Sequence, residues 1–491
     1  MWRIALKNLN AAELLPLGEI HIVGIGGAGM SAIARILHGK GLAVHGSDRS
    51  EGPLVAALRD EGISIAVGHA PEHIGDAELL LASSAVPDDN IELSAARERG
   101  VPVLRRPDFL HALTAGYEVI AVAGAHGKTT VTGMIATIML EADLDPTFIV
   151  GGTVQSLGTN ARVGEGRYFL IEADEYQHTF LALEPQIAVI TNIEYDHPDV
   201  FPNPRFLRLA FGDFVDRIRP GGLLVACNDD PVAHAVAASF HANGGRLALY
   251  GHEDDVGLAL QAKEISPNDR GGIDFDVVRE GVGKVCAVSL SIPGEHNAIN
   301  ALAALLVAEE LGVDWALSSA ALCNFAGTAR RFEILGETAE VVVIDDYAHH
   351  PTQIRVVLAA ARQRYPGQRI IAVWQPHTFS RVKALRDEFM TAFSGADQVL
   401  VLPIYAAREV DDGTVSHHEL AAGLAEACPE LVEGLVKGDA ELKPASVDTL
   451  EQAVKVLAGQ VQPGDVVLLM GAGNEYVVGQ QLLAVLSERR S

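Results

Sequence analysis

The amino-acid sequence predicts an α/β protein that folds into about three domains. Its 491 residues exceed what one ordinary core holds, since domains average roughly 150 residues. Hydrophobic residues make up 48% of the chain and charged residues 21%, a balance typical of globular α/β proteins. Short apolar strands also alternate with segments of helical spacing, which indicates parallel sheets covered by helices.

The first domain is expected to span residues 1–112. An apolar run at 19–26 ends in glycines and is followed by helical spacing at 30–38, so strand, turn and helix follow one another. Further strands are expected at 44–45 and 79–82, and each leads into polar residues. This alternation indicates a parallel sheet.

A second α/β series is expected to form a domain of residues 113–326. Its strands are expected at 118–123, 168–172, 187–192 and 223–228. Segment 251–293 then alternates polar and apolar residues and contains turn residues, which predicts an antiparallel appendage. A helix is expected at 296–311.

The third series is expected to form a domain of residues 327–491. Its strands are expected at 340–345, 370–374, 398–402 and 465–470. Segment 420–442 is rich in Ala, Glu and Leu, a composition typical of a solvated helical region.

Charge and cysteine content exclude several classes of protein. The 37 Lys and Arg residues against 64 Asp and Glu give a net charge of −27, which argues against nucleic-acid or anionic-membrane binding. Any phosphate ligand must therefore be held locally. The cysteines Cys227, Cys286, Cys323 and Cys428 form no C-x-x-C pair, so we interpret them as core residues rather than zinc ligands or disulfides.

The N-terminal segment has no signal-peptide pattern, and no apolar run reaches the length of a membrane span. We therefore expect a cytoplasmic protein. The sequence leaves the choice between a monomer and a homodimer open.

A glycine-rich segment between a strand and a helix is the strongest local signal. It contains the loop residues Gly124, Ala125, His126, Gly127, Lys128, Thr129 and Thr130. Glycines let backbone N–H groups and the helix N-terminus approach a triphosphate, Lys128 can neutralise it, and the Thr129 hydroxyl can bind magnesium. Val122 stands where the strict P-loop pattern has its first glycine, so an ordinary glycine turn is the alternative.

Acidic residues follow two later strands of the same domain. Glu172-Ala173-Asp174-Glu175 follows one, and Asn192-Ile193-Glu194-Tyr195-Asp196-His197 follows the other. The carboxyl ends of parallel strands meet at one edge of a sheet, here beside the expected phosphate loop. Glu172 and Thr129 are therefore candidate magnesium ligands, whereas His197 by itself is more typical of a structural hydrogen-bonding residue.

The first domain carries a dinucleotide-type fingerprint, Gly24-x-Gly26-x-x-Gly29, with Asp48 at the spacing of a ribose-binding acid. This pattern alone suggests a dehydrogenase. It reports only a pyrophosphate at a helix N-terminus, however, and UDP carries one as NAD does. Since hydride transfer has no use for ATP and magnesium, the second phosphate loop argues against a simple oxidoreductase.

The series of motifs GAHGKTT, EADE, NIEYDH, GEHNAIN, RRFE and DDYAHHP resembles the Mur ligase family in content and order. The resemblance covers essentially the whole chain. It implies a Rossmann-like UDP-binding domain, a central P-loop-type ATPase domain with the antiparallel appendage, and a C-terminal Rossmann-like domain that closes over the active site.

Further segments, GIGGAGMS, GSD, SSAVP and QPHTFSR, resemble the members that add L-alanine to UDP-N-acetylmuramate. The implied reaction belongs to peptidoglycan synthesis, uses ATP and Mg²⁺, and passes through an acyl phosphate. Tyr176-Gln177 stands where these members usually have Ser-Asp, and Tyr176 and Tyr195-Asp196-His197 instead resemble the murein-tripeptide ligase of recycling. A non-ligase nucleotide-binding protein is the remaining alternative.

The resemblance also implies roles for individual residues. Residues 124–130 would hold the ATP phosphates, with Thr129, Glu172 and His197 around magnesium. His296, Asn297 and Asn300 would contact adenine, although by themselves they also fit the capping side chains of a helix N-terminus. Arg331 would contact the phosphates and Asp346 the ribose.

His349 and Arg381 would face the reacting end of the muramate or the incoming amino acid, and with Lys128 and His197 they form the expected catalytic set. The 347–351 turn that carries His349 also fits an ordinary loop. The expected UDP-sugar contacts are Gly26, Gly27, Ala28, Gly29, Met30, Ser31, Asp48, Ser84 and Arg106.

Overall fold

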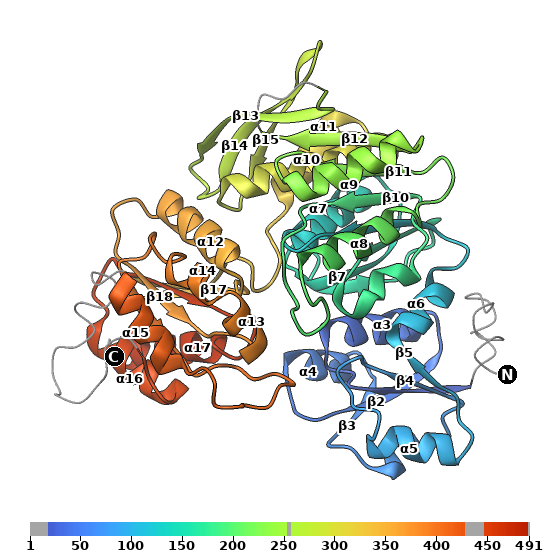
Figure 1. The fold of residues 1–491 in the computed structure, drawn as a ribbon, viewed down its shortest axis with the longest axis horizontal. Helices are drawn as coiled ribbons and strands as arrows, with labels where there is room; N and C mark the ends of the chain where they lie inside the picture. Colours follow the sequence, from blue (N-terminus) through green and yellow to red (C-terminus); the bar gives the residue numbers. More distant parts are fainter. Residues whose placement is uncertain (1–17, 253–256, 428–445, 490–491) are drawn as a thin grey trace.

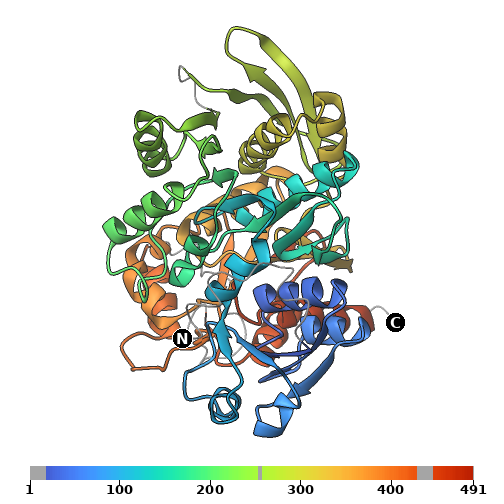
Figure 2. The same cartoon turned by 90° about the vertical axis from the view of Figure 1, so that its right-hand side faces the viewer.

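The computed structural model describes residues 18–252, 257–427 and 446–489, which form three α/β units (Figures 1 and 2). Each unit is built on its own sheet. Among the described residues, no helix is both long enough and apolar enough to cross a membrane.

The first sheet has five parallel strands in the order β3-β2-β1-β4-β5. Its strands are β1 (Glu19–Val23), β2 (Ala43–Asp48), β3 (Ser64–Val67), β4 (Leu79–Ala82) and β5 (Val103–Arg105). Its helices are α3 (Ala28–Gly39), α4 (Pro53–Asp60), η1 (Pro71–Ile74), α5 (Ile91–Glu98) and α6 (Arg106–Thr114). Central β1 and β4 are almost wholly buried because helices cover both faces of the sheet.

The middle sheet has ten strands in the order β15-β14-β13-β12-β11-β10-β6-β9-β7-β8. Its strands are β6 (Glu118–Ala123), β7 (Thr147–Val154), β8 (Thr159–Arg162), β9 (Tyr168–Glu172), β10 (Ile187–Ile190), β11 (Leu223–Cys227), β12 (Arg246–Gly251), β13 (Leu260–Pro267), β14 (Ile273–Arg279) and β15 (Gly283–Leu290). Its helices are α7 (Lys128–Glu141), η2 (Tyr176–Ala182), α8 (Pro204–Val215), α9 (Pro231–Ala242), α10 (Glu295–Glu310) and α11 (Trp315–Asn324).

The predicted antiparallel appendage is present as β13, β14 and β15, which pair antiparallel to one another. It is not a separate layer, because β13 also pairs in parallel with β12 and so extends the main sheet. Figure 1 shows this extension at the top of the molecule. The expected strand 187–192 ends earlier, at Ile190, so Asn192 lies in the loop that follows the strand.

The third sheet has five strands in the order β16-β17-β20-β18-β19. Its strands are β16 (Glu333–Thr338), β17 (Val341–Asp346), β18 (Ile370–Trp374), β19 (Gln398–Val401) and β20 (Val466–Met470). Its helices are α12 (Pro351–Arg364), α13 (Phe379–Ala384), α14 (Arg386–Met390), α15 (His417–Ala427), α16 (Leu450–Gln460) and α17 (Tyr476–Glu488). Only the pairing of β16 with β17 is antiparallel.

The helical region expected at 420–442 is confirmed in its described first part, but it is only partly solvated. Helix α15 covers the beginning of that segment, and it buries Leu420, Ala421 and Leu424 against the third core. The remaining positions of the expected helix from 428 onward lie outside the described residues, as does Cys428. Cys227, Cys286 and Cys323 are free thiols, and Cys227 is buried in the middle core.

Candidate active site

The phosphate loop joins β6 to α7 and depends on two glycine positions. Gly124 and Gly127 have φ angles of 139° and 80°, which L-residues with side chains rarely adopt. A Cβ atom at Gly124 would lie 2.0 Å from Thr191 Oγ1, and one at Gly127 would lie 2.7 Å from Asn300 Oδ1. Asn192 holds the loop from the next strand end, because its Oδ1 accepts a hydrogen bond from the His126 amide at 2.8 Å.

Lys128 begins α7 and points toward a cluster of carboxylates. Its Nζ donates to Glu175 Oε2 at 2.8 Å and also to the Gly124 carbonyl. Burial lowers the pKa of Lys128, but the negative charges of Glu175, Asp174 and Glu172 outweigh it, so the pKa is raised. The ammonium group is therefore charged at neutral pH, and Glu175, in the loop that follows β9, holds it in place.

Two of the three residues expected to bind magnesium, Thr129 and Glu172, contact each other directly. Thr129 Oγ1 donates to Glu172 Oε1 at 3.1 Å, and Glu172 Oε2 accepts from the Gly151 amide at 2.7 Å. His197 reaches the same cluster through Glu175, since its Nε2 lies 3.7 Å from Glu175 Oε1. Hydroxyl and carboxylate oxygens are the donors that Mg²⁺ prefers, so Thr129 and Glu172 fit this ion.

One pocket is lined by residues of the middle and third units that were expected to contact ATP. Its lining includes His126, Gly127, Thr129, Thr130, His296, Asn297, Asn300, Arg331 and Asp346. Lys128 and the remaining loop residues Gly124 and Ala125 are not part of this lining, because the Lys128 side chain turns toward Glu175.

The residues at the start of α10 do not act as the capping side chains that were the alternative. Gly294 occupies the N-cap and makes no side-chain capping bond, and its amide donates to Gln363 Oε1 at 3.0 Å. Instead, Asn297 Nδ2 donates to the Pro293 carbonyl at 2.6 Å, and Asn300 Nδ2 donates to Asn297 Oδ1 at 3.1 Å. Burial, assisted by the charge of Arg331, lowers the pKa of His296 to about 4, so its ring is neutral at neutral pH.

Asp346 ends β17 beneath the same pocket. Its Oδ2 accepts from the Phe332 amide and its Oδ1 accepts from the Ala348 amide, both at 2.8 Å. Burial raises its pKa, although Arg331 and these two amides oppose the shift. In this arrangement Asp346 fixes the chain before β16 and after β17, in addition to facing the pocket.

A buried ion pair connects Arg381 to the middle unit. Arg381 Nε donates to Asp196 Oδ1 at 2.7 Å and a terminal nitrogen donates to Asp196 Oδ2 at 3.2 Å. The two side chains are only 4% and 5% exposed. His349 Nε2 lies 3.7 Å from the same carboxylate, and its Nδ1 is 2.8 Å from the Tyr347 carbonyl oxygen. Burial and the charge of Arg381 hold the pKa of His349 well below its usual value.

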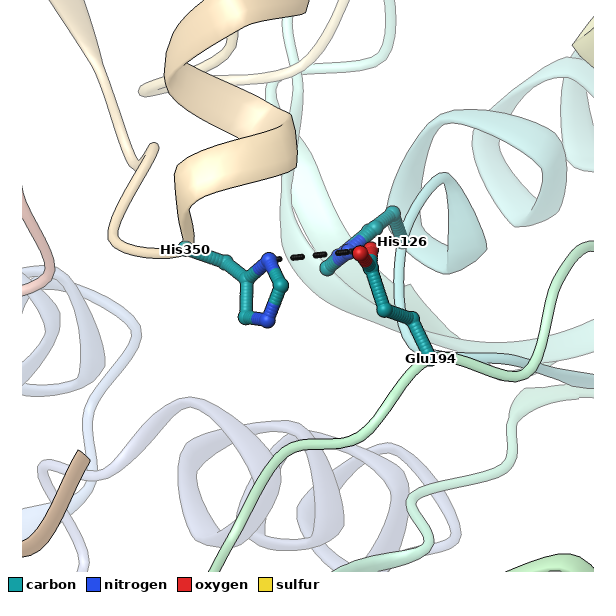
Figure 3. A group of neighbouring side chains, drawn as sticks. All are labelled: His126, Glu194 and His350. Carbon is teal, nitrogen blue, oxygen red and sulfur yellow. Dashed lines mark hydrogen bonds and ion pairs between the residues drawn. The ribbon is translucent and has the colours of Figure 1, made fainter. Parts of the chain in front are cut away.

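His126 of the phosphate loop contacts the third unit as well as its own. Its Nε2 lies 2.6 Å from Glu194 Oε2, and its Nδ1 accepts from Gln353 Nε2 at 2.8 Å. His350, which precedes α12, points toward the same carboxylate, with its Nδ1 at 3.6 Å from Glu194 Oε2 (Figure 3). Gln353 Oε1 also accepts from the His349 and His350 amides, so one side chain links the phosphate loop to the turn that carries His349.

The expected UDP contacts gather at the carboxyl ends of β1 and β2. Asp48 Oδ2 accepts from the Gly26 amide at 2.8 Å, which fixes the glycine loop at the N-terminus of α3. A Cβ atom at Gly29 would lie 2.8 Å from the Arg106 guanidinium carbon, so Arg106 packs against this loop. A terminal nitrogen of Arg106 lies 3.5 Å from Asp174 Oδ2, which joins the first unit to the acidic cluster around Lys128.

Three of the expected UDP contacts are less direct. Met30 and Ser31 have buried side chains, and Ser31 Oγ donates to the Ala28 carbonyl. The backbone amides of both residues donate to the Gly27 carbonyl, so their hydrogen bonds fix the start of α3. Ser84 is half-buried in the loop after β4, the strand beside β1.

Family models match nearly the whole chain. The Mur ligase family catalytic domain matches residues 19–118, the Mur ligase middle domain 122–308, and the Mur ligase glutamate ligase domain 330–473. The chain belongs to the Mur ligase family.

Two relatives similar over nearly their full length share one enzyme name. This Mur ligase is 43% identical to a UDP-N-acetylmuramate--L-alanine ligase of Saccharopolyspora erythraea, over 98% of this chain and 96% of the relative. A ligase of the same name from Roseiflexus castenholzii is 42% identical over 95% of this chain and 97% of its own length.

Two solved structures share the fold. The UDP-N-acetylmuramate-alanine ligase of Thermotoga maritima has a TM-score of 0.79 at 29% identity, covering 96% of this chain and 99% of that chain. A murein peptide ligase of Psychrobacter arcticus has a TM-score of 0.72 at 25% identity, with the same coverage. Both similarities extend over all three units of this Mur ligase.

Four residues that organise the site of this Mur ligase had no individual role predicted from the sequence. Glu175 pairs with Lys128, Asp196 pairs with Arg381, Glu194 contacts His126, and Gln353 links His126 to the 347–350 turn. The first three belong to the strand-end carboxylate groups that the sequence singled out. Gln353 had no comparable signal, because a glutamine in a helix is usually solvated.

Proposed function

We propose that this Mur ligase joins L-alanine to the carboxylate of UDP-N-acetylmuramate and converts ATP to ADP and phosphate. Support comes from the full-length relatives that carry this activity in their names. The observation that carries the proposal is the pair of phosphate-type loops on adjoining units, with Arg106 bridging from one loop to the carboxylates around the other. Such an arrangement suits two phosphate-bearing substrates that must react with each other.

In this proposal each unit has a separate task. Residues 1–112 bind the UDP-sugar, residues 113–326 bind ATP, and residues 327–491 bring in the amino acid. The reaction contributes to peptidoglycan synthesis, and we propose the cytoplasm as its location because ATP is available there.

The reaction requires activation, because a free carboxylate would have to expel oxide when an amine attacks it. A carboxylate oxygen of the muramate therefore takes the γ-phosphoryl group of ATP, which releases ADP and leaves an acyl phosphate. The alanine amine then attacks the acyl carbon, and phosphate leaves as the amide bond forms. Lys128 and the loop amides stabilise the negative charge that develops on the transferred group.

The other groups of the chain position the reactants. Thr129 and Glu172 would hold magnesium, which supplies further positive charge at the phosphates. Arg381 is engaged by Asp196, so it orients the third unit against the middle one while its remaining N–H groups face His377. His349 is neutral and sits beside the same carboxylate, where it can accept a hydrogen bond from the incoming amine.

The amine substrate distinguishes the proposal from its alternative. Phosphate release should be measured with UDP-N-acetylmuramate and ATP, with L-alanine, glycine, L-serine or the murein tripeptide as the amine. We expect release that depends on both the UDP-sugar and L-alanine. Faster release with the tripeptide would assign the chain to recycling, and release without any amine dependence would exclude a ligase.

We also expect the first unit to select UDP over a dinucleotide. The N-terminus of α3 can accommodate the pyrophosphate of either ligand, but the neighbouring acidic cluster around Lys128 belongs to a second phosphate site. Calorimetry on the full chain should give binding of UDP-N-acetylmuramate without detectable binding of NAD or NADP. Tight dinucleotide binding without a response to the UDP-sugar would restore the dehydrogenase interpretation.

Replacing Glu172 with glutamine tests the magnesium site. The change keeps the shape of the side chain but removes a negative charge beside Thr129. The Mg²⁺ concentration that gives half-maximal activity should therefore rise by roughly tenfold or more. A magnesium titration of ligation measures the effect. Glu165→Gln, an exposed change in the same unit, is the control and should behave as the wild type. An unchanged titration for Glu172→Gln would remove Glu172 from the site.

A further inference from the structure

Glu194 contacts two functional elements that belong to different units. Its Oε2 meets His126 Nε2 of the phosphate loop at 2.6 Å. Its Oε1 accepts a hydrogen bond from Thr352 Oγ1, in the first turn of α12, at 2.5 Å. Figure 3 shows Glu194 between His126 on one side and His350, which precedes α12, on the other.

The charges around Glu194 favour this bridge. Burial raises the pKa of Glu194, but the hydrogen bond from His126, the charge that His350 carries in acid and the Thr352 hydroxyl lower it to about 2. Burial lowers the pKa of His350 to about 4, so that ring is neutral at neutral pH. An ionised carboxylate thus lies at the N-terminal end of α12, where the helix dipole favours negative charge.

The same contact is connected to the turn that carries His349. Gln353 donates to His126 Nδ1 and accepts from the His349 and His350 amides. The backbone of His126 is fixed in turn by Asn192. A displacement of the phosphate loop would therefore disturb the docking of α12 and the position of His349.

We propose that Glu194 is a positioning residue that couples the ATP phosphate loop to the docking of the C-terminal unit. This inference rests on the proposed function in that it takes the loop's ligand to be ATP. A coupling of this kind is reciprocal: a nucleotide that orders the loop strengthens docking, and docking strengthens nucleotide binding by the same factor. Glu194 touches neither substrate in this role and acts through His126 and Thr352.

Thr352→Val provides the test, because valine keeps the shape of threonine but cannot donate to Glu194. The capping of α12 stays intact, since it uses the His350 ring and the backbone amide of Thr352. We expect the affinity for the non-hydrolysable analogue AMP-PNP, measured by calorimetry on the full chain, to fall by roughly fivefold or more. Thr352→Ser retains a hydroxyl and should therefore bind AMP-PNP with the affinity of the wild type. Thr414→Val, an exposed change in the same unit whose hydroxyl donates to Asp412, outside α12, is the matched control.

Because Thr352 also lines the nucleotide pocket, a double-mutant cycle separates a direct contact from the proposed coupling. Glu194→Ala alone should weaken AMP-PNP binding, and Thr352→Val should cause no further loss in that background. Equal losses from Thr352→Val in both backgrounds would overturn the proposal, as would wild-type affinity in Thr352→Val. A wild type that binds AMP-PNP but does not ligate L-alanine would refute the proposed function and leave this comparison valid.

Thermal unfolding of each variant checks the fold. We expect the transition temperatures of Thr352→Val and Thr352→Ser to stay close to that of the wild type, since the first variant replaces one hydroxyl with a methyl group and the second removes one methyl group. A loss of affinity that follows a loss of stability in both variants would contradict a positioning role.

Discussion

Lys128→Ala is expected to abolish ligation while the affinity for UDP-N-acetylmuramate changes by no more than a few-fold. The Lys128 ammonium is charged, lies at the N-terminus of α7, and is held by Glu175 at 2.8 Å. Its loss removes the positive charge that opposes the developing charge of phosphoryl transfer. Removing one such preorganised donor typically lowers kcat by roughly 10²–10³. The UDP-sugar is proposed to bind another unit, so its affinity should be largely preserved.

The loss in Lys128→Ala should exceed that single-donor figure, because Glu172, Asp174 and Glu175 then face the ATP phosphates without compensation. Coupled phosphate release and calorimetry with the UDP-sugar measure the two quantities. Lys284→Ala, an exposed change on β15, should retain both. A rate within a few-fold of the wild type in Lys128→Ala would show that the phosphate loop has been misassigned.

Asp196→Asn is expected to cause a large loss of both stability and turnover. The change leaves the Arg381 guanidinium buried without its ionised partner at the contact between the middle and C-terminal units. Breaking a buried pair in this way costs about 3–5 kcal/mol. The free energy of unfolding, from denaturant titration, and kcat should fall together because the same contact orients His349.

The pH dependence of this loss has a definite sign. Burial raises the pKa of Asp196, but Arg381 and the neighbouring histidines hold it well below its usual value. The pair therefore stabilises the fold fully above the unfolded-state pKa of about 4, and its contribution declines as the pH falls below that value. The difference in unfolding free energy between the wild type and Asp196→Asn should accordingly be largest near neutral pH and shrink in acid.

Two comparisons make the Asp196 prediction specific. The double variant Asp196→Asn with Arg381→Met removes both charges, so it should recover part of the lost stability. Asp213→Asn, an exposed change on α8, should leave stability and turnover unchanged. A double variant less stable than Asp196→Asn would contradict a cost that arises from the unpaired guanidinium.

The sequence by itself determined the fold class and the chemistry of the loops. The alternation of apolar strands with helical spacing predicted the parallel sheets, and strict alternation predicted the antiparallel β13–β15 extension. Glycines between β6 and α7 predicted a phosphate loop, and the structure explains them by the close approach of Thr191 and Asn300. These features are local, because periodicity, turn chemistry and positive φ angles depend on neighbouring residues.

Two short or half-exposed strands were not predicted from the sequence. Strands β8 and β16 pair at sheet edges, where a partner strand rather than an apolar run specifies the structure. Helix α15 begins the segment that was interpreted as solvated from its Ala, Glu and Leu content, yet it buries Leu420 and Leu424. Average composition does not reveal which face of a helix finds a partner.

The connections within the site were decided only by the tertiary structure. Strand-end carboxylates were predicted to gather near the loop, but not that Glu175 would pair with Lys128, Asp196 with Arg381, and Glu194 with His126 and Thr352. Asp196 and Arg381 lie 185 positions apart in the sequence and Glu194 and Thr352 lie 158 apart. Such pairs depend on how two units dock, and docking is set by the complementarity of whole surfaces, which no local pattern of residues encodes.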